Sequence, residues 1–152
     1  MAKKKPTSET VRTYGDYPEG PVRKILTGRR TRSCAGDYPS KKNGVLVPFE
    51  SLLEGDLVVI MEKDLEIARY WAQPETFRWR DEAGRCRRYT PDFLVLKVDG
   101  TRVYREVKLK KQRKRDPNLG GRLPRIEQEC ATRGARFEFW TEDEICIRTN
   151  AR

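Results

Sequence analysis

Apolar residues between positions 45 and 63 recur at the three- and four-residue spacing of an amphipathic helix. Val45 to Val47 predicts a short strand, and Pro48 then begins the helical pattern at a position where proline is tolerated. We expect this helix to end near Lys63 and Asp64. The apolar positions that define it are Phe49, Leu52, Leu53, Leu57, Ile60 and Met61.

The following segment alternates between apolar and polar residues, which is typical of strands. Residues 67–80 predict one strand, interrupted at Gln73 and Pro74, and a turn follows at 81–84. Residues 87–98 predict a second strand, in which Pro91 marks an edge or a bulge. The Asp99–Gly100 pair is a hairpin signal, so residues 102–109 are predicted to form the third strand.

The C-terminal third returns to helix and strand. Residues 110–121 (KKQRKRDPNLGG) are too polar and broken for anything but a loop, whereas 123–133 predict a helix capped by Gly134. Residues 136–140 predict a strand and 141–145 a short helical turn. The order of helix, three strands, helix and strand predicts a mixed α/β sandwich around a small sheet. Residues 1–44 are expected to form a basic, partly irregular arm, and 45–152 one domain.

The charge balance adds a partner class. Lysine and arginine number 33 against 23 acidic residues, a net charge of +10. This excess favours a polyanionic partner, nucleic acid before membrane, although a generally basic soluble protein has the same composition. No apolar run is long enough to span a bilayer and no secretory signal is visible. We therefore expect a cytoplasmic protein that works on nucleic acid.

Cysteine and histidine usage excludes several chemistries. The chain has no histidine, which rules out Ser-His-Asp, Cys-His and histidine–metal nuclease sites. A zinc site would need four scattered thiols to converge, so we expect reduced cysteines instead. These cysteines are Cys34, Cys86, Cys130 and Cys146.

Two carboxylates and a lysine stand in the predicted hairpin, where folding alone gives no reason for them. Glu106 and Lys108 share one face of the third strand, and Asp92 reaches that face only in one register parity. A two-residue turn would pair Asp92 with Val107, on the wrong face. A three-residue loop, 99–101, would pair Asp92 with Lys108, and a bulge near Pro91 is the other solution.

In the favourable register, a divalent cation is the natural compensation for two neighbouring carboxylates. Magnesium takes one or two carboxylates plus phosphate and water, and it acidifies a bound water that Lys108 would position or deprotonate. A third carboxylate, Glu54, would come from the preceding helix. The alternatives are a surface Glu–Lys ladder on the hairpin and a capping box formed by Ser51 and Glu54.

Three stretches carry a resemblance to a known family. Residues 36–64 with their ES-x-x-E helix, residues 68–95 with Q-P and T-P-D-F, and the R-E-V-K at 105–108 are similar to TnsA, the endonuclease subunit of heteromeric cut-and-paste transposases. The stretches occur in family order and spacing. The best-known member has glutamine at the position of Glu106, where glutamate is the commoner nuclease residue. Many relatives carry a further C-terminal domain, which the resemblance here does not reach.

The resemblance implies a restriction-endonuclease-like PD-(D/E)xK core and a Mg²⁺-dependent DNA endonuclease, with Mn²⁺ as a substitute. Such an enzyme would cut the 5′ ends of a mobile element in double-stranded DNA, beside a TnsB-like transposase subunit and a regulator. A stand-alone phage or defence nuclease, a junction resolvase and a silent DNA-binding module remain alternatives. The implied metal ligands are Glu54, Asp92, Glu106 and the Val107 carbonyl, with Lys108 catalytic and Gln73 supporting.

Basic residues in three clusters are candidates for DNA backbone contacts, although each is equally a solvated charge. No base-reading module is apparent, which suggests that a partner chooses the sequence. Phe77, Trp79 and Tyr89 are better explained by packing than by stacking on bases. The candidate DNA contacts are Arg29, Arg30, Arg32, Lys41, Lys42, Lys110, Lys111, Arg113, Lys114 and Arg115.

Overall fold

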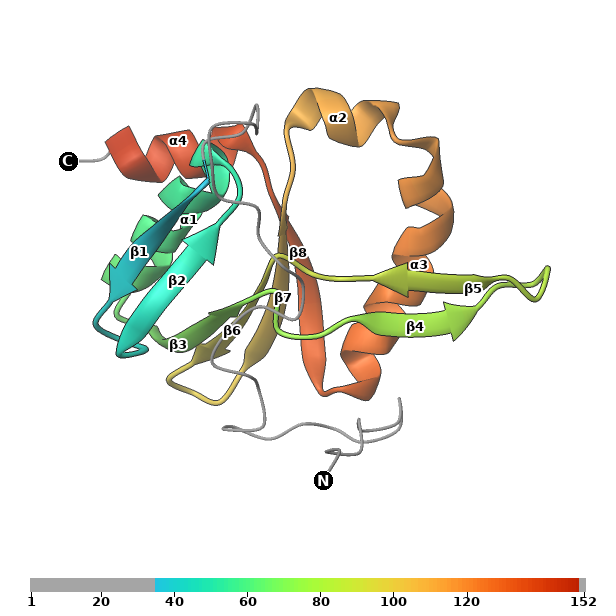
Figure 1. The fold of residues 1–152 in the computed structure, drawn as a ribbon, viewed down its shortest axis with the longest axis horizontal. Coiled ribbons are helices and arrows are strands. Elements are labelled where there is room, and N and C mark those ends of the chain that lie inside the picture. Colours follow the sequence, from blue (N-terminus) through green and yellow to red (C-terminus); the bar gives the residue numbers. More distant parts are fainter. Residues whose placement is uncertain (1–34, 151–152) are drawn as a thin grey trace.

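A mixed four-stranded sheet forms the centre of the protein (Figure 1). The computed structural model describes residues 35–150. The strand order is β3 (Ile67–Ala72), β6 (Phe93–Lys97), β7 (Arg102–Val107) and β8 (Ala135–Trp140). The first two neighbouring pairs are antiparallel, and β7 and β8 are parallel. Because parallel neighbours need a long crossover, the chain between them crosses through helices α2 (Lys110–Arg115) and α3 (Pro117–Thr132).

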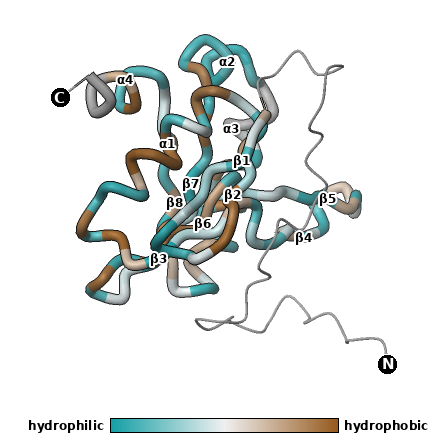
Figure 2. Tube along the Cα trace, turned by 60° about the vertical axis from the view of Figure 1, so that its left-hand side comes forward, coloured by the Kyte–Doolittle hydropathy of each residue, from teal (hydrophilic) through white to brown (hydrophobic). Residues whose placement is uncertain are grey.

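Helices cover both faces of this sheet. On one face, α1 (Leu52–Lys63) and α4 (Glu142–Asn150) pack on Phe93, Val95 and Val103. On the other, Ile126 of α3 packs with its neighbours on the alternate strand positions. Figure 2 shows α1 with long hydrophobic stretches and α2 as largely hydrophilic. The predicted fold class, a mixed α/β sheet flanked by helices and compatible with a restriction-endonuclease-like core, is confirmed.

A hairpin of β1 (Gly36–Ser40) and β2 (Val45–Phe49) precedes the first helix. Pro48 lies in β2, so the prediction that it begins the helix is wrong. Ser51 is the N-cap instead, with its hydroxyl accepting from the Glu54 amide, and α1 begins at Leu52. Residues 36–40, predicted from the sequence to belong to the arm, pair with β2 instead. This strand pairing keeps residues 45–49 extended despite their helical spacing. The predicted helix end at residues 63–64 is confirmed.

Both long predicted strands are divided in the structure. The interruption at Gln73 and Pro74 separates β3 from β4 (Phe77–Arg80), and the segment around Pro91 separates β5 (Cys86–Tyr89) from β6. Strands β4 and β5 form a two-stranded sheet of their own, which extends sideways from the central sheet (Figure 1). The predicted turn at residues 81–84 joins them.

The loop predicted for residues 110–121 is wrong. Residues 110–115 form α2, and α3 already begins at Pro117. Lysine, arginine and glutamine are good helix formers, and proline suits the first turn of a helix. The α2 residues, KKQRKR, include no apolar side chain, and none of them is buried. Hydrophobic periodicity therefore could not reveal this helix. The predicted strand at 136–140 and the helical turn after it are confirmed as β8 and α4. Among the described helices, none is long and apolar enough to cross a membrane.

Candidate functional site

The register of β6 and β7 decides whether the candidate residues meet. Leu94 pairs with Tyr104 and Leu96 with Arg102, so the connecting loop comprises residues 98–100. The Lys97 amide closes it by donating to the Thr101 carbonyl over 2.9 Å. The predicted three-residue loop at 99–101 is therefore displaced, and its individual pairs are wrong. Its parity is right, however, and this parity puts Asp92 on the Glu106 side of the sheet.

Asp92 is held between the ends of two strands. Its Oδ2 accepts from the Val107 amide over 2.8 Å, and its backbone carbonyl accepts from the Gln73 amide over 2.7 Å. Gln73 is almost fully buried and has a φ of 43°, in the left-handed region that non-glycine residues rarely adopt. This strained residue therefore fixes the backbone of Asp92 from the side of β3.

Glu106 is the most strongly perturbed carboxylate of the site. Burial raises its pKa from 4.5 to about 7, with the Glu54 charge acting in the same direction. The Tyr89 hydroxyl opposes this by donating to Oε2 over 2.5 Å, and the Lys108 and Arg122 charges also lower the pKa. Burial beside Glu106 and Asp92 in turn raises the pKa of Tyr89. One carboxylate is thus contacted by the Tyr89 hydroxyl and lies in the field of three further charges, those of Glu54, Lys108 and Arg122.

Glu54 occupies the first turn of α1. Its Oε2 accepts from the Glu50 amide over 2.9 Å, and its own amide donates to the Ser51 hydroxyl over 3.2 Å. The predicted cap by Ser51 is therefore confirmed, although the Glu54 carboxylate accepts from the Glu50 amide, whereas a full capping box uses the Ser51 amide. The Glu54 charge also acts on Glu106, so the start of α1 belongs to the electrostatic environment of the hairpin.

Lys108 forms an ion pair that the sequence did not predict. Its Nζ lies 2.7 Å from Oδ2 of Asp116, and both side chains are one-fifth exposed. Asp116 ends α2, within the segment that was predicted to be a loop. An open groove beside this pair is lined by Lys108, Leu109, Lys111, Gln112, Arg115 and Asp116.

Two further residues of the site were missed. Tyr89 was assigned to packing, and it does pack against Phe77 and Phe137, but its hydroxyl also holds Glu106. Arg122 was assigned no role, yet α3 brings its charge to Glu106. Only the tertiary fold joins these residues to the hairpin, so no local sequence signal could have identified them.

The donor set suits a hard divalent cation, although the side chains do not form a ready-made cluster. Within residues 35–150, no three His, Cys, Asp or Glu residues are arranged to hold a metal ion. Asp92 and Glu106 nevertheless lie at the same end of β6 and β7, and the Glu54 charge acts on Glu106. Carboxylate oxygens are the ligands that Mg²⁺ prefers. The ligand roles of Glu54, Asp92, Glu106 and the Val107 carbonyl stay predictions.

The candidate DNA contacts differ in what their side chains do. Lys42 donates its ammonium to the carbonyls of Met61, Asp64 and Ile67, which caps the end of α1. Lys110 pairs with Asp143, and Arg113 lies over the Phe139 ring. Their contacts with DNA stay predictions. Lys41, Lys111, Lys114 and Arg115 are exposed, whereas Arg29, Arg30 and Arg32 lie outside the described residues.

A comparison with protein-family models supports the same assignment. The model described as TnsA-like endonuclease N terminal matches residues 64–142, just over half of the chain. The match includes Gln73, Asp92, Glu106 and Lys108, and Glu54 precedes it. None of the curated proteins matches the chain. With the family match, the mixed sheet and the residues gathered at the end of its central hairpin, the chain belongs to the TnsA-like endonucleases.

Proposed function

We propose that this protein is a metal-dependent DNA endonuclease that cuts the 5′ ends of a mobile element during cut-and-paste transposition. The observation that carries the proposal is the meeting of Asp92, Glu106 and Lys108 at one end of β6 and β7 within the family match. Double-stranded DNA is the proposed substrate. A TnsB-like transposase subunit and a regulator are the proposed partners.

Glu54, Asp92 and Glu106 would hold Mg²⁺, or Mn²⁺ in its place, with the Val107 carbonyl assisting. The bound metal would acidify the attacking water and neutralise charge on the scissile phosphate. Two hydrogen bonds support the proposed position of Asp92, one from the Val107 amide to its carboxylate and one from the Gln73 backbone amide to its carbonyl. The remaining ligand side chains would have to adjust when the ion binds.

Lys108 would act on the nucleophile. Its positive charge lowers the pKa of Glu106, and its ammonium forms an ion pair with Asp116. In this pairing Asp116 orients the lysine, which would donate to the attacking water or the phosphate oxygen and so position the reacting groups. The nearby groove bounded by Lys111 and Arg115 offers positive charge where the DNA backbone would lie.

The test is nicking of supercoiled plasmid with Mg²⁺ or Mn²⁺, with and without a candidate transposase partner. Wild type is compared with Glu106→Ala and with Glu127→Ala, an exposed glutamate on α3 that serves as the matched control. We expect cleavage by wild type and by the control, and none by Glu106→Ala. Cleavage only with the partner supports the transposition role, and cleavage without it supports a stand-alone nuclease. Salt-dependent DNA binding without cleavage under any condition would contradict the proposal.

A further inference from the structure

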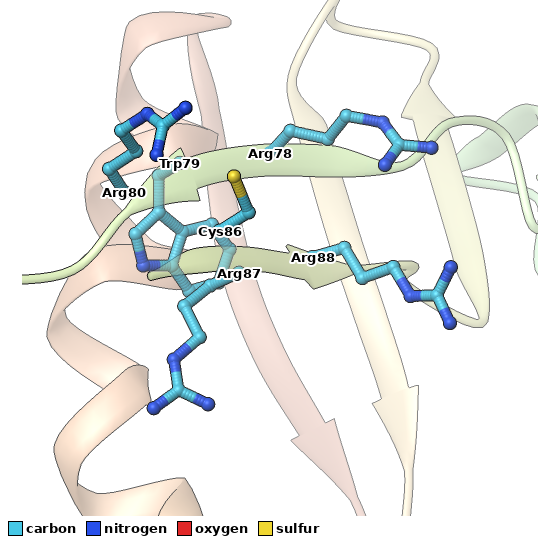
Figure 3. A pocket seen from close by; sticks show the side chains of 6 residues that line it. All are labelled: Arg78, Trp79, Arg80, Cys86, Arg87 and Arg88. Atoms are coloured by element: carbon cyan, nitrogen blue, oxygen red, sulfur yellow. The ribbon is translucent and has the colours of Figure 1, made fainter. Parts of the chain in front are cut away.

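The hairpin of β4 and β5 carries a concentration of positive charge that the proposed active site does not use. Residues 77–89 contain five arginines and two acidic residues. The hairpin extends sideways from the central sheet, and its two strands form a sheet of their own (Figure 1). The groove along it is lined by Arg78, Trp79, Arg80, Cys86, Arg87 and Arg88 (Figure 3).

The two faces of this hairpin have different tasks. Phe77 is fully buried and packs edge-on against Tyr104, while Trp79 and Tyr89 also pack against the core. Because side chains alternate along a strand, the residues between them point the other way. This outer face carries Arg78, Arg80, Cys86 and Arg88, all of them exposed. The inner face therefore anchors the hairpin, and the outer face is available to a partner.

Folding does not account for the charges on the outer face. Arg78 pairs directly with Arg88 across the two strands, and like charges opposite one another destabilise a sheet. Figure 3 shows both side chains extending in the same direction, with Arg80 and Arg87 toward the other end of the ribbon. Within the described part of the chain, neither Arg78 nor Arg88 forms an ion pair with a carboxylate.

The other hairpin arginines are accounted for by the turn. Asp81 accepts from Arg85 Nε at 3.0 Å and from Arg87 Nε at 2.9 Å. The Arg85 backbone amide, together with these side-chain contacts, lowers the pKa of Asp81 to about 2. Arg80 donates to the Gly84 carbonyl at 2.9 Å. Asp81 thus pairs with Arg85 and Arg87, whereas Arg78 and Arg88 have no carboxylate partner among the described residues.

We propose that Arg78 and Arg88 form a phosphate clamp that grips the backbone of duplex DNA beside the active site. The guanidinium fork matches phosphate oxygens, and about 5 Å separates directly opposed strand positions. Two long arginine side chains on opposed positions can therefore bind one phosphate or two successive phosphates of one strand. Tyr89, next to Arg88, donates to Glu106, so the clamp is joined to the proposed catalytic residues through one strand. The inference rests on the proposed function for its choice of ligand.

The experiment measures binding of the full chain to a labelled DNA duplex, in EDTA and across a salt series. Each neutralised phosphate contributes about 0.9 to the slope of log affinity against log salt. For Arg78→Gln with Arg88→Gln we expect binding about tenfold weaker at low salt and a slope less steep by about 2. Arg78→Lys with Arg88→Lys should keep most of the slope, because both charges remain. Thermal melts of each variant confirm that the fold is intact.

Arg85→Gln is the matched control, since it removes a hairpin arginine that Asp81 already pairs. A slope change confined to the Arg78 and Arg88 variants supports the clamp. An unchanged slope, an equal effect of Arg85→Gln, or a wild type that binds no duplex would overturn it. Because the assay omits divalent metal, loss of the clamp is distinguished from failure of the proposed nuclease, which only the plasmid assay reports.

Discussion

At the scale of single residues, the candidate site is an assembly of charges that each modify the others. Burial raises the pKa of Glu106, while the Tyr89 hydroxyl and the Lys108 charge lower it. Lys108 is in turn held by Asp116, and Asp92 by the Val107 amide. A buried charge in such a network destabilises the fold when a partner charge is removed. A residue that lowers stability and is nevertheless present is therefore a candidate for a functional role.

Glu106→Gln should stabilise the metal-free protein at high pH. The folded pKa of about 7 lies above the ordinary 4.5, so the native state binds more protons and the wild type loses stability as pH rises between these values. The loss reaches at most about 3 kcal/mol. We expect the variant to melt higher than wild type at pH 8 in EDTA, and the difference to vanish below pH 5. Thermal melts across this range test it; a constant difference would contradict the raised pKa.

Lys108→Ala should cost catalysis far more than DNA affinity. Removing a group that acts on the reacting atoms typically lowers the rate about 10²–10⁴-fold, whereas losing one phosphate contact changes binding only modestly. Cleavage rates and duplex affinity are measured for the same preparation. Lys111→Ala, an exposed lysine on α2, is the control and should lower affinity more than cleavage at saturating DNA. Equal losses in Lys108→Ala would identify a binding lysine instead.

At the scale of elements, a buried polar network lies beside the β4–β5 hairpin. Arg133, just after α3, pairs with Glu75 at 3.1 Å and with Glu129 at 2.9 Å, and its guanidinium lies over the Phe77 ring. The Tyr104 hydroxyl also donates to Glu75. This network connects the segment before β4 with the end of α3, so it stabilises the part of the hairpin that faces the core.

Arg133→Met should destabilise the fold by about 3–5 kcal/mol, because it removes the buried cation paired with Glu75 and one of the two cations paired with Glu129. Arg125→Met is a close control, since Arg125 pairs with the same Glu129 but its side chain is 43% exposed. Because the Arg125 side chain stays partly in solvent, we expect its loss to cost less, on the order of 1 kcal/mol. Urea denaturation at neutral pH compares the two variants. Similar losses of unfolding free energy in both variants would contradict a special contribution of the buried Arg133 ion pairs.

At the scale of the whole molecule, the central sheet brings distant parts of the chain to one end of its inner strands, β6 and β7. Glu54 comes from α1, Asp92 and Glu106 from the central hairpin, and Arg122 from the crossover helix α3. The two hydrophobic clusters lie on opposite faces of the sheet, so the site lies where elements from both faces meet. Metal binding at this end of the strands would therefore stabilise the folded state of the whole domain.

Saturating Mg²⁺ should raise the melting temperature of the wild type. A ligand at 100 times its Kd stabilises the native state by about 2.7 kcal/mol, if it binds only that state. Asp92→Asn and Glu106→Ala should lose most of this shift, whereas Glu127→Ala should retain it. Melting curves in EDTA and in Mg²⁺ test this without relying on cleavage. A shift that survives in Asp92→Asn would place the metal elsewhere.

The pattern of the sequence by itself determined the order of most elements, the candidate carboxylates and lysine of the site, and the family resemblance. Periodicity predicts an element well where its apolar residues face the core, as in the C-terminal part of α1, where Leu57, Val58, Ile60 and Met61 are buried. It missed α2, which buries no residue, and β1, whose pairing partner is in the next strand. Residue types at short spacing, such as Glu106 and Lys108, identified candidate chemistry for the same reason: strand geometry places them on one face.

Tertiary structure alone decided which of these residues meet. Sequence left two register parities open for the central hairpin, and only the observed loop at 98–100 selects the one that brings Asp92 to Glu106. The tertiary structure also brings the Tyr89 hydroxyl to Glu106, Asp116 to Lys108 and the Lys42 ammonium to the end of α1. These contacts depend on how separate elements pack, and packing is fixed by the whole core rather than by any local pattern. The exposed Arg78–Arg88 pair likewise became visible only once β4 and β5 were paired.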